Sequence, residues 1–355
     1  MGEKKLFKGN EAIAEAAIRG GCRYFFGYPI TPQNEIPEYM SRRMPEVGGV
    51  FLQAESEVAA INMVYGAAGS GARVMTSSSS PGISLKQEGI TYLAGAEVPC
   101  VVVNMVRGGP GLGGIQPAQS DYFQAVKGGG HGDYKIIVYT PASIQETVDI
   151  LWDAYDVAEK YRIPVMILGD GLIGQMMEPV EFKDFKEVSD KDKEWATNGT
   201  QLKRKPRIIN SLYLDADELY QHNIKLAAKY EEIEKNEVKY ETYKLDDAEF
   251  VIVAYGSTSR ICKSVIDKAR ADGIKAGMIR PITIFPFPYE VIAKAAEHAK
   301  MFLSVEMSMG QMVEDVQLAV NGAKPVRFFG RTGGMVPTAK EIKDEILSIC
   351  KGGAR

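Results

Sequence analysis

The chain has 355 residues, of which 45% are hydrophobic and 25% are charged, and its formal net charge is −4. This length predicts two or three domains, and the charge gives no reason to expect nucleic acid or an anionic membrane as a partner. The longest apolar runs, such as VPCVVVNMV, are far shorter than the roughly 20 residues of a membrane-spanning helix, and MGEKKLFKGNEA has no apolar signal core. We therefore expect a cytoplasmic protein.

Residues 1–180 alternate helix and strand patterns. NEAIAEAAIRGG is typical of a helix that Asn10 opens and two glycines close, and CRYFFGY of a short buried strand. Further strands are predicted in ARVMTSSSS, VPCVVVNMVR, YKIIVYTP and IPVMILGDG, with helices such as ASIQETVDILWDAYDVAEKY between them. Continuous Val and Ile runs separated by helices indicate a parallel sheet covered on both faces.

The character of the sequence changes over 181–247, which is charged and weakly periodic. We expect it to connect two domains through a long polar helix or helix pair with little core of its own. The alternation resumes at 248, where AEFVIVAYGS precedes RICKSVIDKARADG, so 248–355 is predicted to be a second, smaller domain. The predicted fold class is α/β with two doubly wound domains.

Cysteine and histidine are scarce in this chain. Its four cysteines, Cys22, Cys100, Cys262 and Cys350, form no Cys-x-x-Cys pair for zinc or an iron–sulfur cluster. We expect four buried thiols. With three histidines in the chain, a multi-histidine site is not expected either, and we predict no metal site on this chain.

The segment FFGYPITPQNEIPEY places a proline-rich turn directly after the first buried strand. Thr31 precedes Pro32, a pattern typical of a helix N-cap followed by proline in the first turn. The turn also lies at the carboxyl end of a strand, where ligands bind in open α/β sheets. Two interpretations stay open: Thr31 caps a helix, or the stiff turn holds its hydroxyl in a crevice.

Two further segments combine polar groups with apolar helices. In QAESEVAAI, Glu57 either stabilises a helix N-terminus or is a carboxylate beside buried surface that needs a partner. In TSSSSPGISL, which includes Ser79, a strand ends in a polar turn before a helix. The N–H groups of that turn suit an anion or a polar ring, although the segment also reads as an ordinary turn.

Arg107 ends the strand MVR and is followed by a glycine-rich loop. Its guanidinium is either a solvated charge or the cation for a carboxylate substrate, which it can bind with two hydrogen bonds. Residues 109–114 match the dinucleotide-binding pattern G-x-G-x-x-G, but Pro110 and Pro117 interrupt the segment. A nicotinamide-dependent oxidoreductase is therefore the weaker interpretation.

Two weaker signals remain. His131 lies in GGGHGDY, and histidine suits proton transfer near neutral pH, although a single loop histidine is more often incidental. GDG at 169–171, followed by Asn198, faintly resembles the diphosphate–magnesium motif of thiamine enzymes. The intervening sequence is charged and broken by proline, so we predict that this match carries no metal site.

GYPITP, ESEVAAI, SSSSPGISL, MVRGGPG, IRPITIFPFP and VEMSMGQM span essentially the whole chain. In these motifs and their order the sequence resembles the alpha subunit of 2-oxoacid:ferredoxin oxidoreductases, above all the branched-chain type that acts on 2-oxoisovalerate (3-methyl-2-oxobutanoate). The resemblance implies oxidative decarboxylation of a 2-oxo acid with thiamine diphosphate. It also implies electron transfer through iron–sulfur clusters to ferredoxin, and transfer of the acyl group to coenzyme A.

The resemblance also implies roles for particular residues. Glu57 matches the glutamate that hydrogen-bonds the aminopyrimidine ring and promotes loss of the thiazolium C2 proton. Tyr28 and Pro29 belong to the same cofactor-binding turn. Thr31 and Arg107 match residues that contact the substrate in the family's pyruvate members.

The same resemblance implies which domains and cofactors belong to this chain and which to partner subunits. Residues 1–180 resemble the pyrimidine-binding domain, and 248–355 the transketolase C-terminal-type domain, whose usual role is assembly. Mg²⁺ and iron–sulfur clusters are expected on partners, namely a beta subunit and a gamma or ferredoxin-like subunit. The active site is expected between the alpha and beta subunits. One departure is Ser308 in VEMSMGQM, where many relatives are expected to have Asn.

Two alternatives stay open beside the branched-chain interpretation. One is a 2-oxoglutarate-specific alpha subunit, which the lack of an obvious second cation for a distal carboxylate disfavours. The other is a non-catalytic assembly subunit. The joint presence of Thr31, Glu57 and Arg107 disfavours a dead site.

Overall fold

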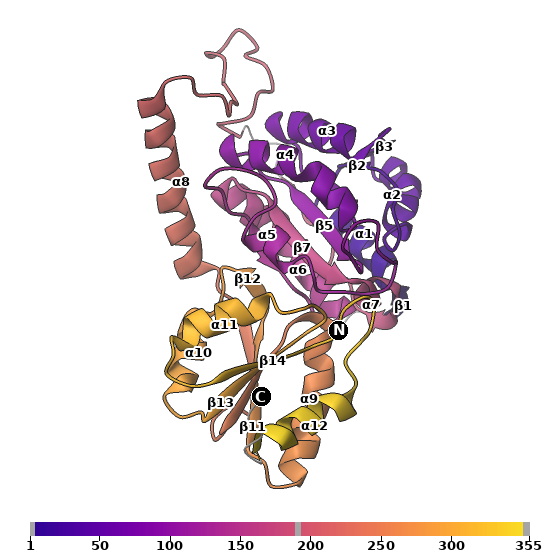
Figure 1. Cartoon of the computed structure of the whole chain (residues 1–355). Coiled ribbons are helices and arrows are strands. Elements are labelled where there is room, and N and C mark those ends of the chain that lie inside the picture. Colours follow the sequence, from indigo (N-terminus) through magenta and orange to yellow (C-terminus); the bar gives the residue numbers. More distant parts are fainter. Residues whose placement is uncertain (1–3, 189–192, 351–355) are drawn as a thin grey trace.

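The computed structural model describes residues 4–188 and 193–350, and within them the larger sheet has seven strands in the order β12-β6-β7-β5-β4-β2-β3 (Figure 1). The six strands from the first half of the chain run parallel, which confirms the predicted parallel sheet. All residues of β5 and β7 are buried, as their apolar sequences require. The strands are β2 (Tyr24–Gly27), β3 (Val50–Gln53), β4 (Val74–Ser78), β5 (Val101–Val106), β6 (Ile137–Tyr139), β7 (Val165–Asp170) and β12 (Thr283–Phe285).

Helices cover both faces of this sheet. The connections from β2 to β3 and from β6 to β7 run along the sheet in one direction, and those from β3 to β4 and β4 to β5 in the other. Because such crossovers are right-handed, α2 and α6 lie on one face and α3 and α4 on the opposite face. The helices are α1 (Gly9–Arg19), α2 (Glu35–Glu46), α3 (Glu57–Gly69), α4 (Pro81–Gly95), α5 (Tyr122–Val126) and α6 (Ile144–Tyr161).

The second domain is built on a five-stranded sheet in the order β14-β13-β10-β11-β9, counted over the described residues. Four of its strands are parallel, and β9 runs antiparallel to β11 at one edge. The elements are β9 (Tyr240–Tyr243), β10 (Phe250–Val253), α9 (Gly256–Ala271), β11 (Ala276–Pro281), α10 (Tyr289–Ala296), β13 (Met301–Glu306), α11 (Met312–Val320), β14 (Val326–Gly330) and α12 (Ala339–Cys350).

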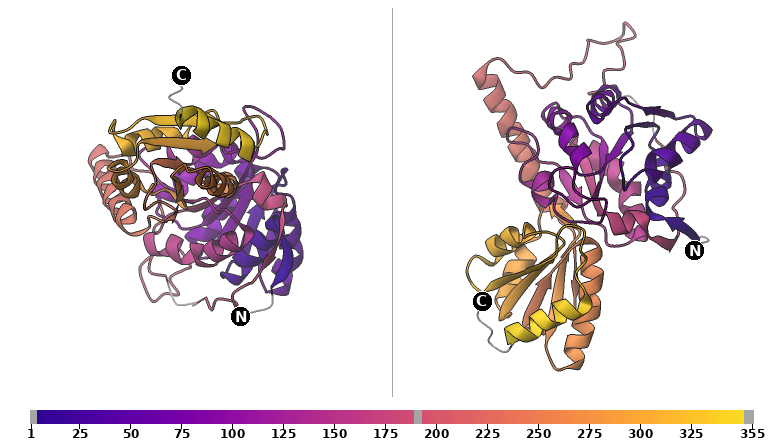
Figure 2. Two further views of the ribbon diagram at one scale, coloured as in Figure 1. Left: turned by 90° about the horizontal axis from the view of Figure 1, so that it is seen from below. Right: turned by 45° about the vertical axis from the view of Figure 1, so that its right-hand side comes forward.

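The connecting segment differs from the sequence prediction in two respects. Helix α8 (Ala216–Asn236) is present, but the residues after it form the strand β9 rather than more helix. The helix also buries Leu226, Tyr230 and Ile233 in the large core, so the segment is not without core contacts. In Figure 2, α8 lies along the outside of the molecule and leads from the first domain to the second.

Polar contacts hold the two domains together. Arg280 on β11 donates two hydrogen bonds to Glu146 on α6, at 2.9 and 2.7 Å, and one to Glu241 on β9 at 2.8 Å. Asp170, the acid of the GDG segment, accepts 2.6 and 3.2 Å hydrogen bonds from the hydroxyl and backbone N–H of Ser257. It also caps α7 (Gly171–Gln175) through the N–H of Leu172 at 3.0 Å. Asp170 therefore acts here as a structural carboxylate.

The remaining expectations concern thiols, metals and membranes. Cys22, Cys100 and Cys262 are buried, but Cys350 is exposed because α12 ends at the surface, so the prediction of four buried thiols is wrong for Cys350. In the described ranges, no group of three His, Cys, Asp or Glu side chains could hold a metal. None of the helices in those ranges has the length and apolar character needed to cross a membrane.

Candidate active site

The proline-rich turn after β2 does not cap a helix. Helix α2 begins at Glu35, and its N-cap residue is Asn34, so the interpretation of Thr31 as a helix N-cap is wrong. The Thr31–Pro32 peptide bond is cis. Instead, the Thr31 hydroxyl accepts a 3.2 Å hydrogen bond from the side chain of Asn34. The turn therefore presents Thr31 beyond the end of the sheet.

Side chains from α1 and α7 hold this turn in place. The carbonyl of Pro32 accepts hydrogen bonds from Asn10 at 2.7 Å and from Gln175 at 2.8 Å. Asn10 was expected to open α1, but it lies inside the helix, because its amide instead reaches the turn and Glu35. The local helix pattern that begins at Asn10 does not indicate this contact, because Pro32 and Glu35 lie far from Asn10 in the sequence.

Arg107 is brought directly against Thr31. Its guanidinium donates a 2.9 Å hydrogen bond from Nη1 to the carbonyl of Thr31, and another of 2.9 Å from Nη2 to the carbonyl of Leu112. The side chain is 7% exposed, and its Nε is buried without a hydrogen-bond partner. A solvated strand-end charge is therefore excluded, and the guanidinium keeps donors for a further acceptor.

A strained residue links Arg107 to the start of α4. Ser80 has a φ of +23°, an uncommon conformation for a residue with a side chain. Its hydroxyl accepts a 3.0 Å hydrogen bond from the backbone N–H of Arg107, and its own N–H donates at 3.0 Å to Asn104. Such strain persists where the surrounding structure enforces it, often at functional sites.

The serine run before Ser80 contains unsatisfied hydroxyls. Ser77 donates a 2.5 Å hydrogen bond to Gln33 and so ties β4 to the turn after β2. The hydroxyls of Ser78 and Ser79 are buried and have no partner. Buried polar groups are normally hydrogen-bonded, so these two oxygens point to a polar molecule bound at this edge.

Glu57 lies at the meeting point of two helix N-termini. It is the first residue of α3, where Ser56, rather than Glu57, caps the helix by accepting from the N–H of Ala59 at 3.2 Å. Its carboxylate lies against Gly82 near the start of α4, where an added Cβ atom would be 2.6 Å from Oε1 of Glu57. Glu57 is 6% exposed, yet among the described residues no donor binds its carboxylate.

Lys86 is a buried cation that our sequence reasoning missed. It is fully buried, and its Nζ lies 3.4 Å from the backbone carbonyl of Glu57. Burial lowers the pKa of Lys86 to about 8, while the nearby charge of Glu57 opposes that shift. The available signal was the spacing of Lys86, which lies three residues after Ile83 and four before Ile90 and so shares the helical face of these apolar residues.

The other predicted residues lie at different distances from this cluster. Tyr28 is half-buried and accepts a hydrogen bond from Gln33 through its carbonyl, and Pro29 is exposed at the tip of the turn. His131 is exposed in a loop that packs against the middle of α4, near Gln87. No described contact joins His131 to Glu57, Thr31 or Arg107, so its role stays a prediction.

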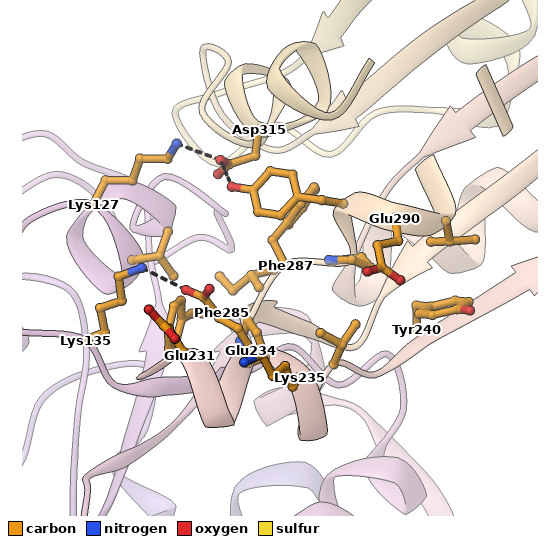
Figure 3. Close-up of a pocket in the computed structure, with 17 residues that line it drawn as sticks. Lys127, Lys135, Glu231, Glu234, Lys235, Tyr240, Phe285, Phe287, Glu290 and Asp315 are labelled. Carbon is orange, nitrogen blue, oxygen red and sulfur yellow. Dashed lines mark hydrogen bonds and ion pairs between the residues drawn. The ribbon is translucent and has the colours of Figure 1, made fainter. Parts of the chain in front are cut away.

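A separate cavity of about 740 Å³ lies between the domains, beside α8 (Figure 3). Its charged side chains are largely paired with each other, as in Lys127 with Asp315 at 2.7 Å and Lys135 with Glu234 at 3.0 Å. None of Thr31, Glu57 or Arg107 lines it. The candidate site therefore lies at the carboxyl ends of β2, β4 and β5 and not in this cavity.

The site fits one half of thiamine diphosphate. A nearly buried carboxylate without a donor suits a ring nitrogen that carries a proton, and Gly82 lets that carboxylate pack closely against the start of α4. The orphan hydroxyls of Ser78 and Ser79 supply further polar contacts along the same edge. Glu57 would hold the ring, and the site offers no cluster of acids for a metal in the described residues.

Comparison with known proteins gives the same assignment. Residues 15–242 match the family model described as pyruvate flavodoxin/ferredoxin oxidoreductase, thiamine diphosphate-binding. Residues 248–342 match pyruvate:ferredoxin oxidoreductase core domain II. The chain is also similar in fold to a 2-oxoglutarate:ferredoxin oxidoreductase of Magnetococcus marinus, with a TM-score of 0.85 and 24% identity, over 98% of this chain and 65% of that one.

Two sequence relatives are more similar. A ketoisovalerate oxidoreductase subunit VorB of Methanothermobacter marburgensis is 52% identical over 97% of both chains. A 2-oxoglutarate synthase subunit KorA of Methanothermobacter thermautotrophicus is 36% identical over 98% of this chain and 100% of its own. Both are named as subunits, which confirms that such chains work with partners. The chain belongs to the family of thiamine diphosphate-binding pyruvate flavodoxin/ferredoxin oxidoreductases.

Proposed function

We propose that this chain is the catalytic alpha subunit of a coenzyme A-acylating oxidoreductase that decarboxylates 2-oxoisovalerate and related branched-chain 2-oxo acids, with ferredoxin as acceptor. One observation carries the proposal: Arg107 contacts Thr31 directly, and Ser80 joins Arg107 to the start of α4, where the Glu57 carboxylate lies against Gly82. The similarity to a ketoisovalerate oxidoreductase subunit supports the choice of substrate. The lower similarity to a 2-oxoglutarate synthase subunit makes that substrate the alternative.

Glu57 is the proton-handling group of this site. Its carboxylate lies at the N-termini of α3 and α4, whose exposed N–H groups favour a negative charge there. When bound, thiamine diphosphate supplies the electron sink for decarboxylation. With the cofactor bound, Glu57 would share a proton with the pyrimidine ring and would orient that ring.

Arg107 is the binding group for the substrate carboxylate. An arginine has five N–H donors in a planar fork, and the carbonyls of Thr31 and Leu112 fix the direction of that fork. The unsatisfied Nε is then available to a carboxylate oxygen. The Thr31 hydroxyl, held by Asn34, contacts the substrate from the neighbouring turn. Together Arg107 and Thr31 would orient the carbon–carbon bond that breaks when carbon dioxide leaves.

Exposed apolar side chains around the site support a partner subunit there. Strand β3 is the free edge of the sheet and exposes Val50 and Leu52. Val58 and Leu85, at the starts of α3 and α4, are also exposed, as is Leu112 in the glycine-rich loop. Apolar side chains gathered on one face are typical of an interface. We propose that a beta subunit with Mg²⁺ and iron–sulfur clusters covers strand β3 and the carboxyl ends of the strands next to it.

The test is the activity of the reconstituted complex. The chain is co-expressed with its partner subunits, and coenzyme A-dependent reduction of a viologen dye is measured without oxygen, with 2-oxoisovalerate, 2-oxoglutarate and pyruvate in turn. We expect the highest kcat/KM with 2-oxoisovalerate. A preference for 2-oxoglutarate would support the alternative substrate. Inactivity with all three, in a complex that contains thiamine diphosphate and clusters, would contradict the proposal.

A further inference from the structure

We infer that the second domain positions Arg107, and therefore takes part in substrate binding as well as in assembly. The inference rests on the proposed role of Arg107 in binding the substrate carboxylate. The positioning residues are Gly334 and Gln119, which act on Arg107 through the glycine-rich loop 108–117. In Figure 1 the segment after β14 leaves the second domain, reaches the first, and returns to form α12.

The glycine-rich loop and the guanidinium form one unit. Arg107 and Pro117 form a β-bridge that closes the loop. Inside it, the N–H of Gly108 donates to Gln116 and the N–H of Gly114 to Gly108, both at 2.9 Å. Since Nη2 of Arg107 donates to the carbonyl of Leu112, the loop holds the side chain of the residue that precedes it. A shift of the loop must therefore shift the guanidinium.

A turn of the second domain that contains Gly333 and Gly334 packs against this loop. Gly334 has a φ of +93°, and a Cβ atom added there would lie 2.4 Å from Cβ of Gln116. A Cβ added at Gly108 would be 3.5 Å from the backbone of Gly333 and of Gly334. The two backbones are thus in close contact next to Arg107, and a side chain at 334 cannot be added without moving the loop.

Gln119 anchors the end of the loop to the same domain. Its backbone N–H donates to Met307 at 2.8 Å, and its Oε1 accepts from the N–H of Met307 at 3.0 Å. Its Nε2 donates to the carbonyl of Tyr255 at 2.9 Å, and Tyr255 donates back to the carbonyl of Gln119 at 3.0 Å. Gln119 is 2% exposed and fully satisfied, which makes it a fixed point.

The consequence is that a displacement of the second domain at this contact shifts Arg107, the group that we propose for the substrate carboxylate. Small misplacement of a binding group is costly for an enzyme. Because Arg107 would act on binding, the effect should fall on KM more than on kcat. A residue that merely stabilised the fold would lower the amount of active enzyme and leave KM unchanged.

The experiment uses three variants in the reconstituted complex, with 2-oxoisovalerate as substrate. We expect Gly334→Ala to raise KM about tenfold with kcat changed by less than about threefold. Gly333→Ala is the matched control, since Gly333 also has a positive φ but no atom near an added Cβ, and its KM should stay within about twofold of the wild type. Combining Gly334→Ala with Gln116→Gly removes the clash and should lower KM again to near the wild-type value.

A second measurement does not depend on activity or on complete folding of one variant. Hydrogen exchange of the Gly108 and Gly114 amides in the full chain should be faster in Gly334→Ala than in Gly333→Ala. If Gly334→Ala does not fold, Gln119→Ala tests the coupling at the other anchor of the loop, and faster exchange of these two amides with a raised KM supports the inference. An unchanged KM and unchanged exchange in the folded variants would overturn the inference. An inactive wild-type complex would instead overturn the proposed function.

Discussion

Two buried glutamates at helix N-termini differ in how many hydrogen-bond donors surround their carboxylates. Glu306, fully buried before α11, accepts hydrogen bonds from Ser304, Ser308 and the backbone N–H groups of residues 311, 312 and 313. Glu57, buried in the first turn of α3, has no donor for its carboxylate among the described residues. A satisfied carboxylate stabilises a fold, whereas an unsatisfied one retains its binding capacity for a ligand.

The same contrast separates the two regions around these residues. At the domain junction, Asp170, Gln119 and Arg280 each have several partners. At the sheet edge, Ser78 and Ser79 have none for their hydroxyls. Unpartnered buried groups reduce stability, and the hydroxyls of Ser78 and Ser79 are such groups next to the proposed site.

The largest effect is expected at Glu57. Glu57→Gln keeps the shape of the side chain but cannot exchange the proton, so kcat should fall by about 10²–10⁴-fold. The rate of viologen reduction in the reconstituted complex measures it. Glu55→Gln is the matched control, because Glu55 lies two residues before Glu57 and its side chain is exposed. This substitution should leave kcat unchanged. Unchanged turnover in Glu57→Gln would favour the assembly-subunit alternative.

A smaller effect is expected at Arg107. Arg107→Lys retains the charge but loses the fork that reaches Thr31 and Leu112, so KM for the 2-oxo acid should rise by roughly 10–100-fold. Steady-state kinetics provide the measurement. Arg23→Lys is the control, since Arg23 also donates to backbone carbonyls but at the opposite end of β2. A KM equal to that of the wild type would argue against a substrate contact.

Glu306 should show the opposite profile to Glu57. Glu306→Gln replaces acceptors by an amide group that cannot receive all the N–H donors around it, and stability should fall by about 2–4 kcal/mol. Urea unfolding of the chain measures this change. KM and kcat per folded complex should remain those of the wild type. Loss of turnover without loss of stability would remove the distinction between the two glutamates.

Lys86 should show the smallest effect, and on stability. Burial lowers its pKa from the model-peptide range to about 8, so the folded chain releases this proton before the unfolded chain does. Between about pH 8 and 10.5 the unfolded state therefore binds more protons, and the free energy of unfolding rises with pH. Lys86→Met removes the buried charge and should stabilise the chain by roughly 1–3 kcal/mol at pH 7.

The control for Lys86 is a second largely buried lysine. Lys229 is paired with Glu97 at 2.5 Å, so Lys229→Met should destabilise the chain by leaving that carboxylate with one fewer partner. Thermal unfolding of both variants at pH 7 and pH 9 gives the comparison. Equal destabilisation by both substitutions would show that Lys86 is a structural cation like Lys229.

Local patterns in the sequence were sufficient for much of the fold. The Val-rich segment of β5 predicted a buried strand because helices on both faces leave it no polar side. The helix of the 181–247 segment was expected too. Strand β9 was not, because its polar residues become a strand only by pairing with β11. The boundaries at 180 and 247 stay predictions.

The sequence by itself predicted Thr31, Glu57 and Arg107 as site residues, because each belongs to a short motif next to a strand or helix end. It also determined the fold class, since periodicity reflects burial. Only the tertiary structure decided that Asn10 supports a turn instead of capping α1, that Lys86 is buried beside Glu57, and that Gly334 contacts the Arg107 loop. These contacts join residues far apart in the chain, and no local pattern records which distant backbone a side chain will meet.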